Sequence, residues 1–192
     1  MSFRNCALAV FSALLLVPLS ASAQETFTTR THDFGISAGY MFEGSAYFAE
    51  YDEYSALEAG FMARVFYDRF IMEKLSFGLY GHAALTDFYR YSEESGSTLL
   101  EAGFTMKPRF FIGEKMALKP GLNVGYRYYL TQDDYLESDG LGLNFSLELQ
   151  YDRGASILPF AEVGFLTQPW GGNDDTDITY DPVLYVQIGI AM

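Results

Sequence analysis

Two histidines, His32 and His82, are the only imidazoles in the sequence and the first candidates for acid–base chemistry. Hydrolysis of the serine type needs a hydroxyl nucleophile, an imidazole base and a carboxylate that orients the base. Neither histidine has a serine and a carboxylate at the spacing of a catalytic motif. His82 also falls on the polar face of an alternating run, which favours a hydrogen-bonded interior residue. We therefore expect no catalytic residues and no enzyme.

A second candidate site is an acidic segment near the end of the chain. Asn173, Asp175 and Asp177 have the spacing of the first ligands of a calcium-binding loop. The pattern then fails, because Ile178 replaces the expected glycine and Leu184 replaces the bidentate glutamate. The three side chains are a weak candidate for Ca²⁺ or Mg²⁺, and a solvated acidic loop is the preferred interpretation. We expect no metal and no cofactor.

Strands must position these residues, because an alternation of apolar and polar residues recurs about eight times between Phe34 and Met192. It is clearest at the end, where every second residue from Leu184 to Met192 is apolar. It is weakest near Leu158 and Phe160, where both faces are apolar. The connectors alternate too: 68–74, 112–115 and 152–155 are short, whereas 43–53, 92–97, 131–140 and 167–181 are mostly longer and acidic. This asymmetry is typical of transmembrane β-barrels with short periplasmic turns and longer extracellular loops.

A soluble barrel of the lipocalin kind also alternates, but with its apolar face inward. Two observations favour the opposite orientation. The polar face is rich in glycine, which suits a narrow interior and packs poorly on an exposed surface. Aromatic residues gather near the run ends on the apolar face, as in the interfacial girdles of membrane barrels: they are Tyr40, Phe42, Tyr67, Tyr89, Tyr126, Tyr128 and Tyr151.

The first 23 residues have the pattern of a cleaved secretory signal peptide. Arg4 precedes a mostly apolar run over 7–19, and Ala21-Ser22-Ala23 supplies a small-residue cleavage site. The apolar run is shorter than the roughly 20 residues that a membrane-spanning helix needs, which argues against an anchor. We expect residues 1–23 to be removed and residues 24–192 to form one domain.

Composition excludes other classes of protein. The net charge of −13 argues against nucleic-acid binding, which needs a basic surface to neutralise phosphates. The single cysteine, Cys6, leaves with the signal peptide, so the mature chain has no disulfide, zinc cluster or cysteine nucleophile.

The alternating runs and the closing strand, Leu184 to Met192, make the chain resemble the small eight-stranded outer-membrane proteins: the OmpA transmembrane domain, OmpX and the opacity-like adhesins. The resemblance covers Phe34 to Met192 and rests on architecture. It implies a Gram-negative outer-membrane location, periplasmic N and C termini, contact with outer-membrane lipid and lipopolysaccharide, and a monomer. It also implies recognition of the C-terminal strand by the barrel-assembly machinery, although Met192 stands where these proteins usually end in an aromatic residue.

The expected inward face carries four acids and four bases. They are Glu58, Glu101, Glu148 and Glu162, with Arg64, Lys107, Lys119 and Arg127. An unpaired charge in a narrow lumen is costly, so we expect these side chains to pair. About eight strands leave an interior that side chains can fill, whereas open channels need nearer 16. A salt-bridged plug is therefore preferred to a selective pore.

We expect an all-β, eight-stranded antiparallel up-and-down transmembrane barrel with a structural or cell-surface interaction role. Its acidic extracellular loops would be its recognition surface, open to an extracellular partner. Two alternatives remain: a small ion or solute channel, and a lipid-modifying enzyme. Lipid A deacylases of this size use a serine and a histidine on the lipid-facing wall, whereas the alternation places His82 on the inward face.

Overall fold

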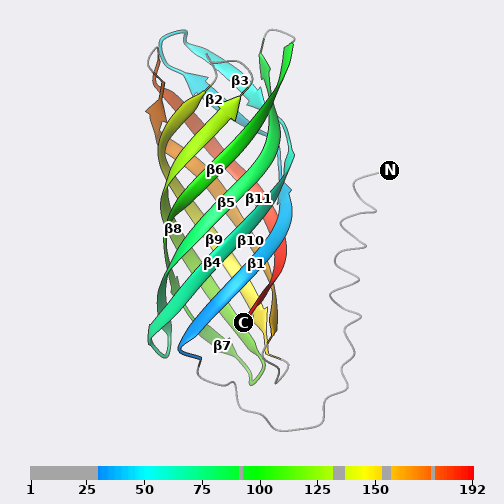
Figure 1. Ribbon diagram of the computed structural model, residues 1–192, viewed down its shortest axis with the longest axis vertical. Helices are drawn as coiled ribbons and strands as arrows, with labels where there is room; N and C mark the ends of the chain where they lie inside the picture. Colours follow the sequence, from blue (N-terminus) through cyan, green and yellow to red (C-terminus); the bar gives the residue numbers. More distant parts are fainter. Residues whose placement is uncertain (1–29, 91–92, 132–136, 153–156, 174–175) are drawn as a thin grey trace, which may run out of the picture.

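Eight long antiparallel strands close into a ring in this computed structural model, which describes residues 30–90, 93–131, 137–152, 157–173 and 176–192. The strands are β1 (His32–Met41), β4 (Gly60–Met72), β5 (Leu75–Arg90), β6 (Glu93–Pro108), β8 (Met116–Thr131), β9 (Ser138–Tyr151), β10 (Leu158–Gly172) and β11 (Ile178–Ala191). Each pairs with the next in this order, and β1 pairs with β11, which closes the ring (Figure 1). The predicted fold class is confirmed. The predicted signal peptide, 1–23, lies outside the described residues.

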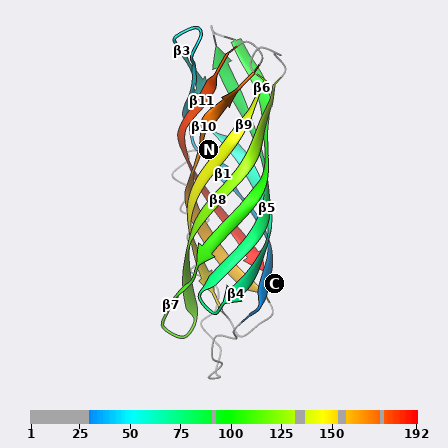
Figure 2. The same cartoon turned by 90° about the vertical axis from the view of Figure 1, so that its left-hand side faces the viewer.

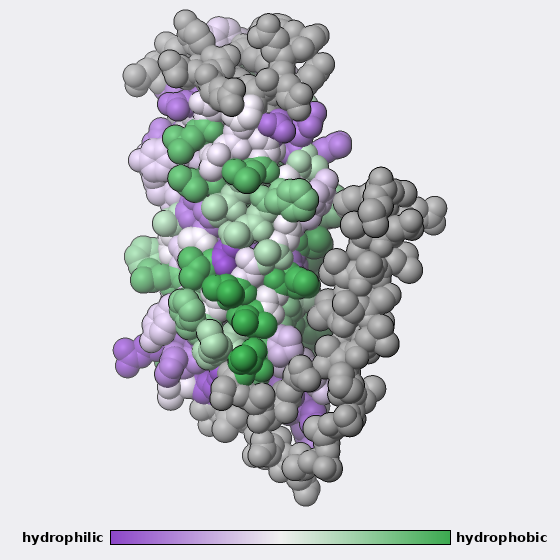
Figure 3. Space-filling view, turned by 45° about the vertical axis from the view of Figure 1, so that its right-hand side comes forward, coloured by the Kyte–Doolittle hydropathy of each residue, from purple (hydrophilic) through white to green (hydrophobic). Residues whose placement is uncertain are grey.

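The strands of the wall also show the predicted alternation, with apolar residues outward and polar or small residues inward. In β6, for example, Leu100 and Phe104 are exposed on the outer surface, while Glu101 and Lys107 are buried inside the barrel. The run around Leu158, the weakest in the sequence, is a complete strand with Leu158 and Phe160 inward. Figure 3 shows apolar side chains gathered over the middle of the outer surface, with hydrophilic ones towards its ends. No helix among the described residues is long and apolar enough to cross a membrane.

Three of the four long segments expected to be loops, 43–53, 92–97 and 167–181, are mostly strand where the structure describes them; half of the fourth, 132–136, lies outside the described residues. Segment 43–53 contains β2 (Gly44–Phe48) and begins β3 (Glu53–Leu57), a hairpin that stands beyond β1 and β4 (Figure 2). Segments 92–97 and 167–181 are largely taken up by the ends of β6, β10 and β11. The expectation of extended loops at this end, called the outer end below, is therefore corrected.

The alternation reverses between the two ends: apolar residues point outward near the inner end and inward near the outer end. The reversed pattern does not match a lipid-facing strand, which is why the sequence predicts loops there. In the lower part of β11, Val186 and Ile188 are exposed and Gln187 is buried. Near the start of the same strand, Ile178 and Tyr180 are buried, while Thr179 and Asp181 lie on the outer surface. A wall surrounded by water needs polar residues outside and apolar ones inside, as in a soluble barrel.

The β2–β3 hairpin joins the ring through two irregular positions. β1 ends its pairing with β4 at Met41 opposite Gly60, and β2 begins its pairing with β3 at Gly44 opposite Leu57. Between them, the Phe42 amide donates to Leu184 of β11, and the Glu58 amide donates to Asp87 of β5. Like a β-bulge, such an irregularity shifts the side-chain alternation by one residue. It puts Leu57, an apolar residue of the kind expected on the outer face of the wall, inside the barrel.

A short strand and tight turns close the inner end. β7 (Phe110–Ile112) pairs with the start of β8 through a turn at Gly113, whose φ of 66° falls in the left-handed region that favours glycine. Arg109 lies 3.9 Å above the Phe70 ring and donates to the carbonyl of Glu73. These contacts tie two turns together at this end.

The close packing of the wall gives a first prediction. A Cβ at Gly103 would lie 2.2 Å from the Val124 carbonyl oxygen, whereas a Cβ at Gly81 would meet nothing nearer than 3.6 Å. Gly103→Ala should therefore lower the free energy of unfolding by about 2 kcal/mol through overpacking. Gly81→Ala, on the neighbouring strand, should change it by less than about 0.5 kcal/mol. Urea titration of the barrel in micelles would measure both; equal effects would contradict the packing.

Candidate functional site

The candidate site is the interior of the barrel, where seven of the eight predicted charged residues lie buried. They are Arg64, Glu101, Lys107, Lys119, Arg127, Glu148 and Glu162. The structure brings them together in three groups joined by ion pairs and hydrogen bonds, which we call the Arg64, Arg127 and lysine groups.

The Arg64 group joins β4, β8, β10 and β11 across the lumen. Arg64 Nη1 donates to both oxygens of Glu162, at 2.8 and 2.9 Å. The same carboxylate accepts from the Tyr185 hydroxyl at 2.7 Å and from the Gln187 amide at 2.6 Å. Arg64 Nη2 also reaches Asn123 Oδ1 at 3.2 Å. Glu162 therefore accepts from three donor side chains, while the Arg64 guanidinium also lies over the Phe66 and Tyr80 rings, 5.2 and 5.4 Å from their centroids.

The Arg127 group joins β5, β6, β8 and β9. Arg127 Nε and Nη2 approach Glu101 Oε2 at 2.6 and 2.5 Å. The other oxygen of Glu101 accepts from Tyr80 and from Asn144 Nδ2. Arg127 Nη2 also donates to Asn144 Oδ1 at 2.7 Å, which completes a compact cluster.

The lysine group fills the inner end and contains two acids, Asp33 and Asp68, that are not among the eight predicted lumen charges. Lys107 Nζ lies 3.1 Å from Asp68 Oδ2 and 2.9 Å from Glu148 Oε2. Lys119 Nζ lies 2.7 Å from Asp33 Oδ2 and 3.3 Å from Glu148 Oε1. Asp68 falls in a segment predicted to be a turn, but it lies an even number of residues from Arg64 and so points to the same inward face. Asp33 shares the parity of Gly35 and Ser37, and this was the signal that could have found it.

Glu58 does not belong to the interior. Its side chain is exposed, and its residue sits at the irregular position between β3 and β4. Counting alternation backwards from Arg64 places Glu58 inward, but the extra residue there reverses the parity. The prediction for Glu58 is therefore corrected.

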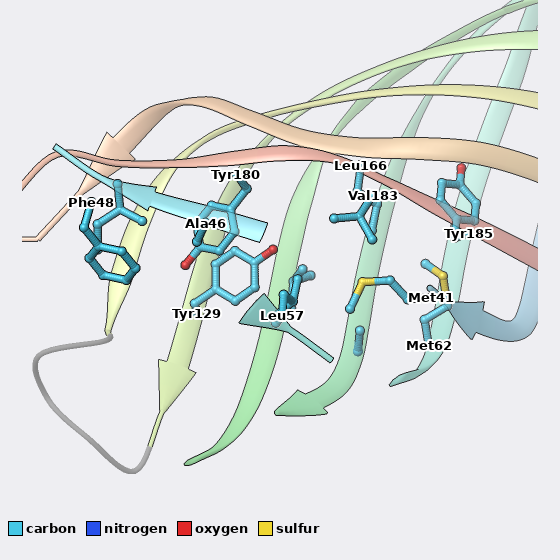
Figure 4. Close-up of a cluster of buried hydrophobic side chains, with 13 residues drawn as sticks. Met41, Ala46, Phe48, Leu57, Met62, Tyr129, Leu166, Tyr180, Val183 and Tyr185 are labelled. Atoms are coloured by element: carbon cyan, nitrogen blue, oxygen red, sulfur yellow. The ribbon is translucent and has the colours of Figure 1, made fainter. Parts of the chain in front are cut away.

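An apolar layer fills the lumen beyond the charged groups, towards the outer end (Figure 4). Tyr129 and Tyr180 stack with centroids 4.0 Å apart and an angle of 14° between ring planes. The layer also contains Met41, Ala46, Phe48, Leu57, Met62, Ala84, Leu99, Leu166, Ile178, Val183 and Tyr185. Most of these side chains are fully inaccessible to water, so the layer packs like a protein core.

His82 lies between the two arginine groups, against Tyr80 of one and Tyr185 of the other. It is buried, neither ring nitrogen has a hydrogen-bond partner, and its ring contacts Tyr80 and Tyr185 with centroids 5.1 and 6.3 Å away. The expected hydrogen-bonded histidine is therefore inside the barrel but without a bond. His32 is exposed and stacks on Tyr67, so the two histidines lie apart.

The candidate cation loop is only partly described. Asp175 lies outside the described residues. Asn173 Oδ1 accepts a hydrogen bond from the Thr176 amide at 2.9 Å, so the asparagine side chain stabilises the turn. Asp177 is exposed and bridges to Gly172 through its backbone. Within the described part of the chain, no group of three or more histidine, cysteine or acidic residues is placed to hold a metal.

Exposed acids collect at the outer end. Among the described residues they are Glu43, Glu50, Asp52, Glu58, Glu137, Asp177 and Asp181. In the β2–β3 hairpin, the Tyr47 hydroxyl donates to Asp52 Oδ1 at 3.0 Å. This bond and the charge of Asp52 raise the pKa of Tyr47 above its ordinary value. At the inner end, exposed bases and acids are mixed: Arg69 and Lys74 lie beside Glu73 and Glu114.

A closed eight-stranded barrel with an apolar outer wall and charges inside defines the class of small outer-membrane β-barrels. No family model matches the sequence, and no curated protein sequence is significantly similar to it. Among solved structures, the chain is similar to the outer membrane protein OprG from Pseudomonas aeruginosa, with a TM-score of 0.59 and 12% identity over 88% of this chain and 99% of OprG. It is also similar to Neisserial surface protein A, with a TM-score of 0.54 and 12% identity over 83% of this chain and 97% of that protein. At such identities the likeness shows the fold alone.

Proposed function

We propose that this chain is a bacterial outer-membrane barrel that neither conducts nor catalyses, and whose acidic outer end is its interaction surface. The observation that carries the proposal is the filled lumen. Arg64, Lys107, Lys119 and Arg127 are each buried and ion-paired. A pore would instead leave its lining charges hydrated.

The two layers close the lumen by different means. The charged groups interlock across the inner and middle parts, and the apolar layer fills the part beyond them. Water and ions would have to break ion pairs in one layer and displace packed side chains in the other. This arrangement favours a structural plug over the small channel considered from the sequence.

The distribution of charge supports the role of the outer end. Outer-membrane barrels place their longer extensions outside and their short turns in the periplasm. In that orientation the acidic end meets the medium and the lipopolysaccharide head groups, and the two termini lie in the periplasm. The last strand, which pairs with both β1 and β10, would be the segment that the barrel-assembly machinery recognises.

Cysteine labelling tests this orientation, because the only cysteine of the sequence precedes the expected mature chain. Ala49→Cys lies in the β2–β3 turn, and Glu114→Cys lies in the turn between β7 and β8; both positions are exposed. We expect a membrane-impermeant maleimide to label Ala49→Cys in intact cells, and Glu114→Cys only after the outer membrane is permeabilised. The reverse result, or labelling of neither in permeabilised cells, would refute the proposed placement.

A further inference from the structure

The outer face of the β2–β3 hairpin carries a pair of aromatic rings in an unusual setting. Tyr47 and Tyr54 are direct cross-strand partners, with ring centroids 4.9 Å apart and ring planes at 46°. Tyr54 is 69% exposed. Their neighbours Ala46, Phe48 and Leu57 point into the barrel and form part of the apolar layer. The rings are thus mounted on a hairpin that is anchored from its other side.

Polar residues of β2 and β11 lie beside the rings, as expected of a surface that faces water. On the same outer surface lie Ser45, Thr179 and Asp181, all polar. The Ser45 hydroxyl donates to Asp181 Oδ2 at 2.5 Å. An aromatic pair in a lipid-facing girdle would have apolar neighbours, as Tyr40 has in Phe42 and Phe61.

Carboxylates flank the rings without compensating bases on the hairpin. Segment 43–58 contains Glu43, Glu50, Asp52, Glu53 and Glu58, and it has no lysine, arginine or histidine. Asp52 is fixed by the Tyr47 hydroxyl and by a backbone φ of 50°. An exposed ring beside a fixed carboxylate attracts a cation in two ways, through the ring quadrupole and through opposite charge.

Arginine matches this surface better than lysine. A guanidinium is planar, stacks on aromatic faces and donates in a fork to carboxylates, whereas an ammonium is a compact and strongly hydrated charge. We propose that the outer face of the β2–β3 hairpin binds an arginine-rich, cationic polypeptide segment, with Tyr47 and Tyr54 as the platform and Asp52 as the fixed anion. This inference rests on the proposed function, because the hairpin must face the medium.

The test uses the full mature protein in nanodiscs of zwitterionic lipid and fluorescent nona-arginine and nona-lysine as probes. We expect nona-arginine to bind more tightly than nona-lysine, and Tyr47→Ala/Tyr54→Ala to weaken nona-arginine binding about tenfold. Tyr54→Phe keeps the ring and should stay within about twofold. The control is Tyr126→Ala/Tyr128→Ala, which removes an edge-to-face tyrosine pair on β8, across the ring from β1 and β4, and should leave binding unchanged. Heat-modifiable gel migration shows that each variant is folded.

The outcomes separate this inference from the proposed function. If the wild type binds nona-arginine and Tyr47→Ala/Tyr54→Ala binds it equally well, the acidic end acts through diffuse charge and the hairpin platform is wrong. Equal binding of nona-lysine, unaffected by the tyrosines, would overturn it too. If the wild type does not bind nona-arginine even at low salt, where charge attraction is strongest, both this inference and the role of the acidic end fail.

Discussion

Glu162→Gln should lower the free energy of unfolding of the barrel by about 3 kcal/mol, because it leaves the buried Arg64 guanidinium without its counter-charge. Glutamine preserves the volume and part of the hydrogen bonding to Tyr185 and Gln187, so the loss measures the charge and not a cavity. Glu43→Gln removes the same charge from an exposed position and should change stability by less than about 0.5 kcal/mol.

A double-mutant cycle isolates the pair. Arg64→Met alone should also be strongly destabilising, because it removes the guanidinium nitrogen that donates to both oxygens of Glu162. The combined Arg64→Met/Glu162→Gln variant should recover about 2 kcal/mol relative to the sum of the single changes. Urea titrations in micelles, under conditions where the folding and unfolding curves coincide, give the four values. Additive effects would mean that the two side chains do not interact in the folded barrel.

The fold was predictable because one physical rule governs most of the wall. A lipid-facing strand must alternate apolar residues that point outward with polar or small residues that point inward, and Leu100, Glu101 and Phe104 follow this rule. The rule fails at the outer end, where the exposed face is polar and the buried face apolar, as for a wall in water. The sequence therefore predicts loops where the structure has β2, β3 and the ends of β10 and β11.

The charged interior was predictable in kind but not in detail. Parity placed Arg64, Lys107 and Glu162 inside, and the cost of a lone buried charge implied that they pair. Which acid meets which base could not be read, because the partners come from strands far apart in sequence, as Lys119 and Asp33 do. Glu58 failed because one extra residue in the backbone reverses parity, and nothing in its local sequence marks that position.

Reconstituted barrels should pass no steady current, which is the largest functional difference between a plug and a pore. Ions crossing the lumen would need to separate Arg64 from Glu162 and Arg127 from Glu101, and then pass side chains such as Leu57 and Leu99 that are inaccessible to water. Burial of an unpaired charge in such surroundings costs several kcal/mol, so the barrier is high in both layers. A 16-stranded porin in the same membrane provides the positive control.

Recording from planar bilayers that contain the pure protein is the most direct measurement of the filled lumen. Folding and insertion are first verified by heat-modifiable migration of the reconstituted sample. Our account predicts a current indistinguishable from that of the bare bilayer over a wide range of salt concentrations. A steady conductance that scales with salt concentration would show a continuous water path through the barrel and would contradict it.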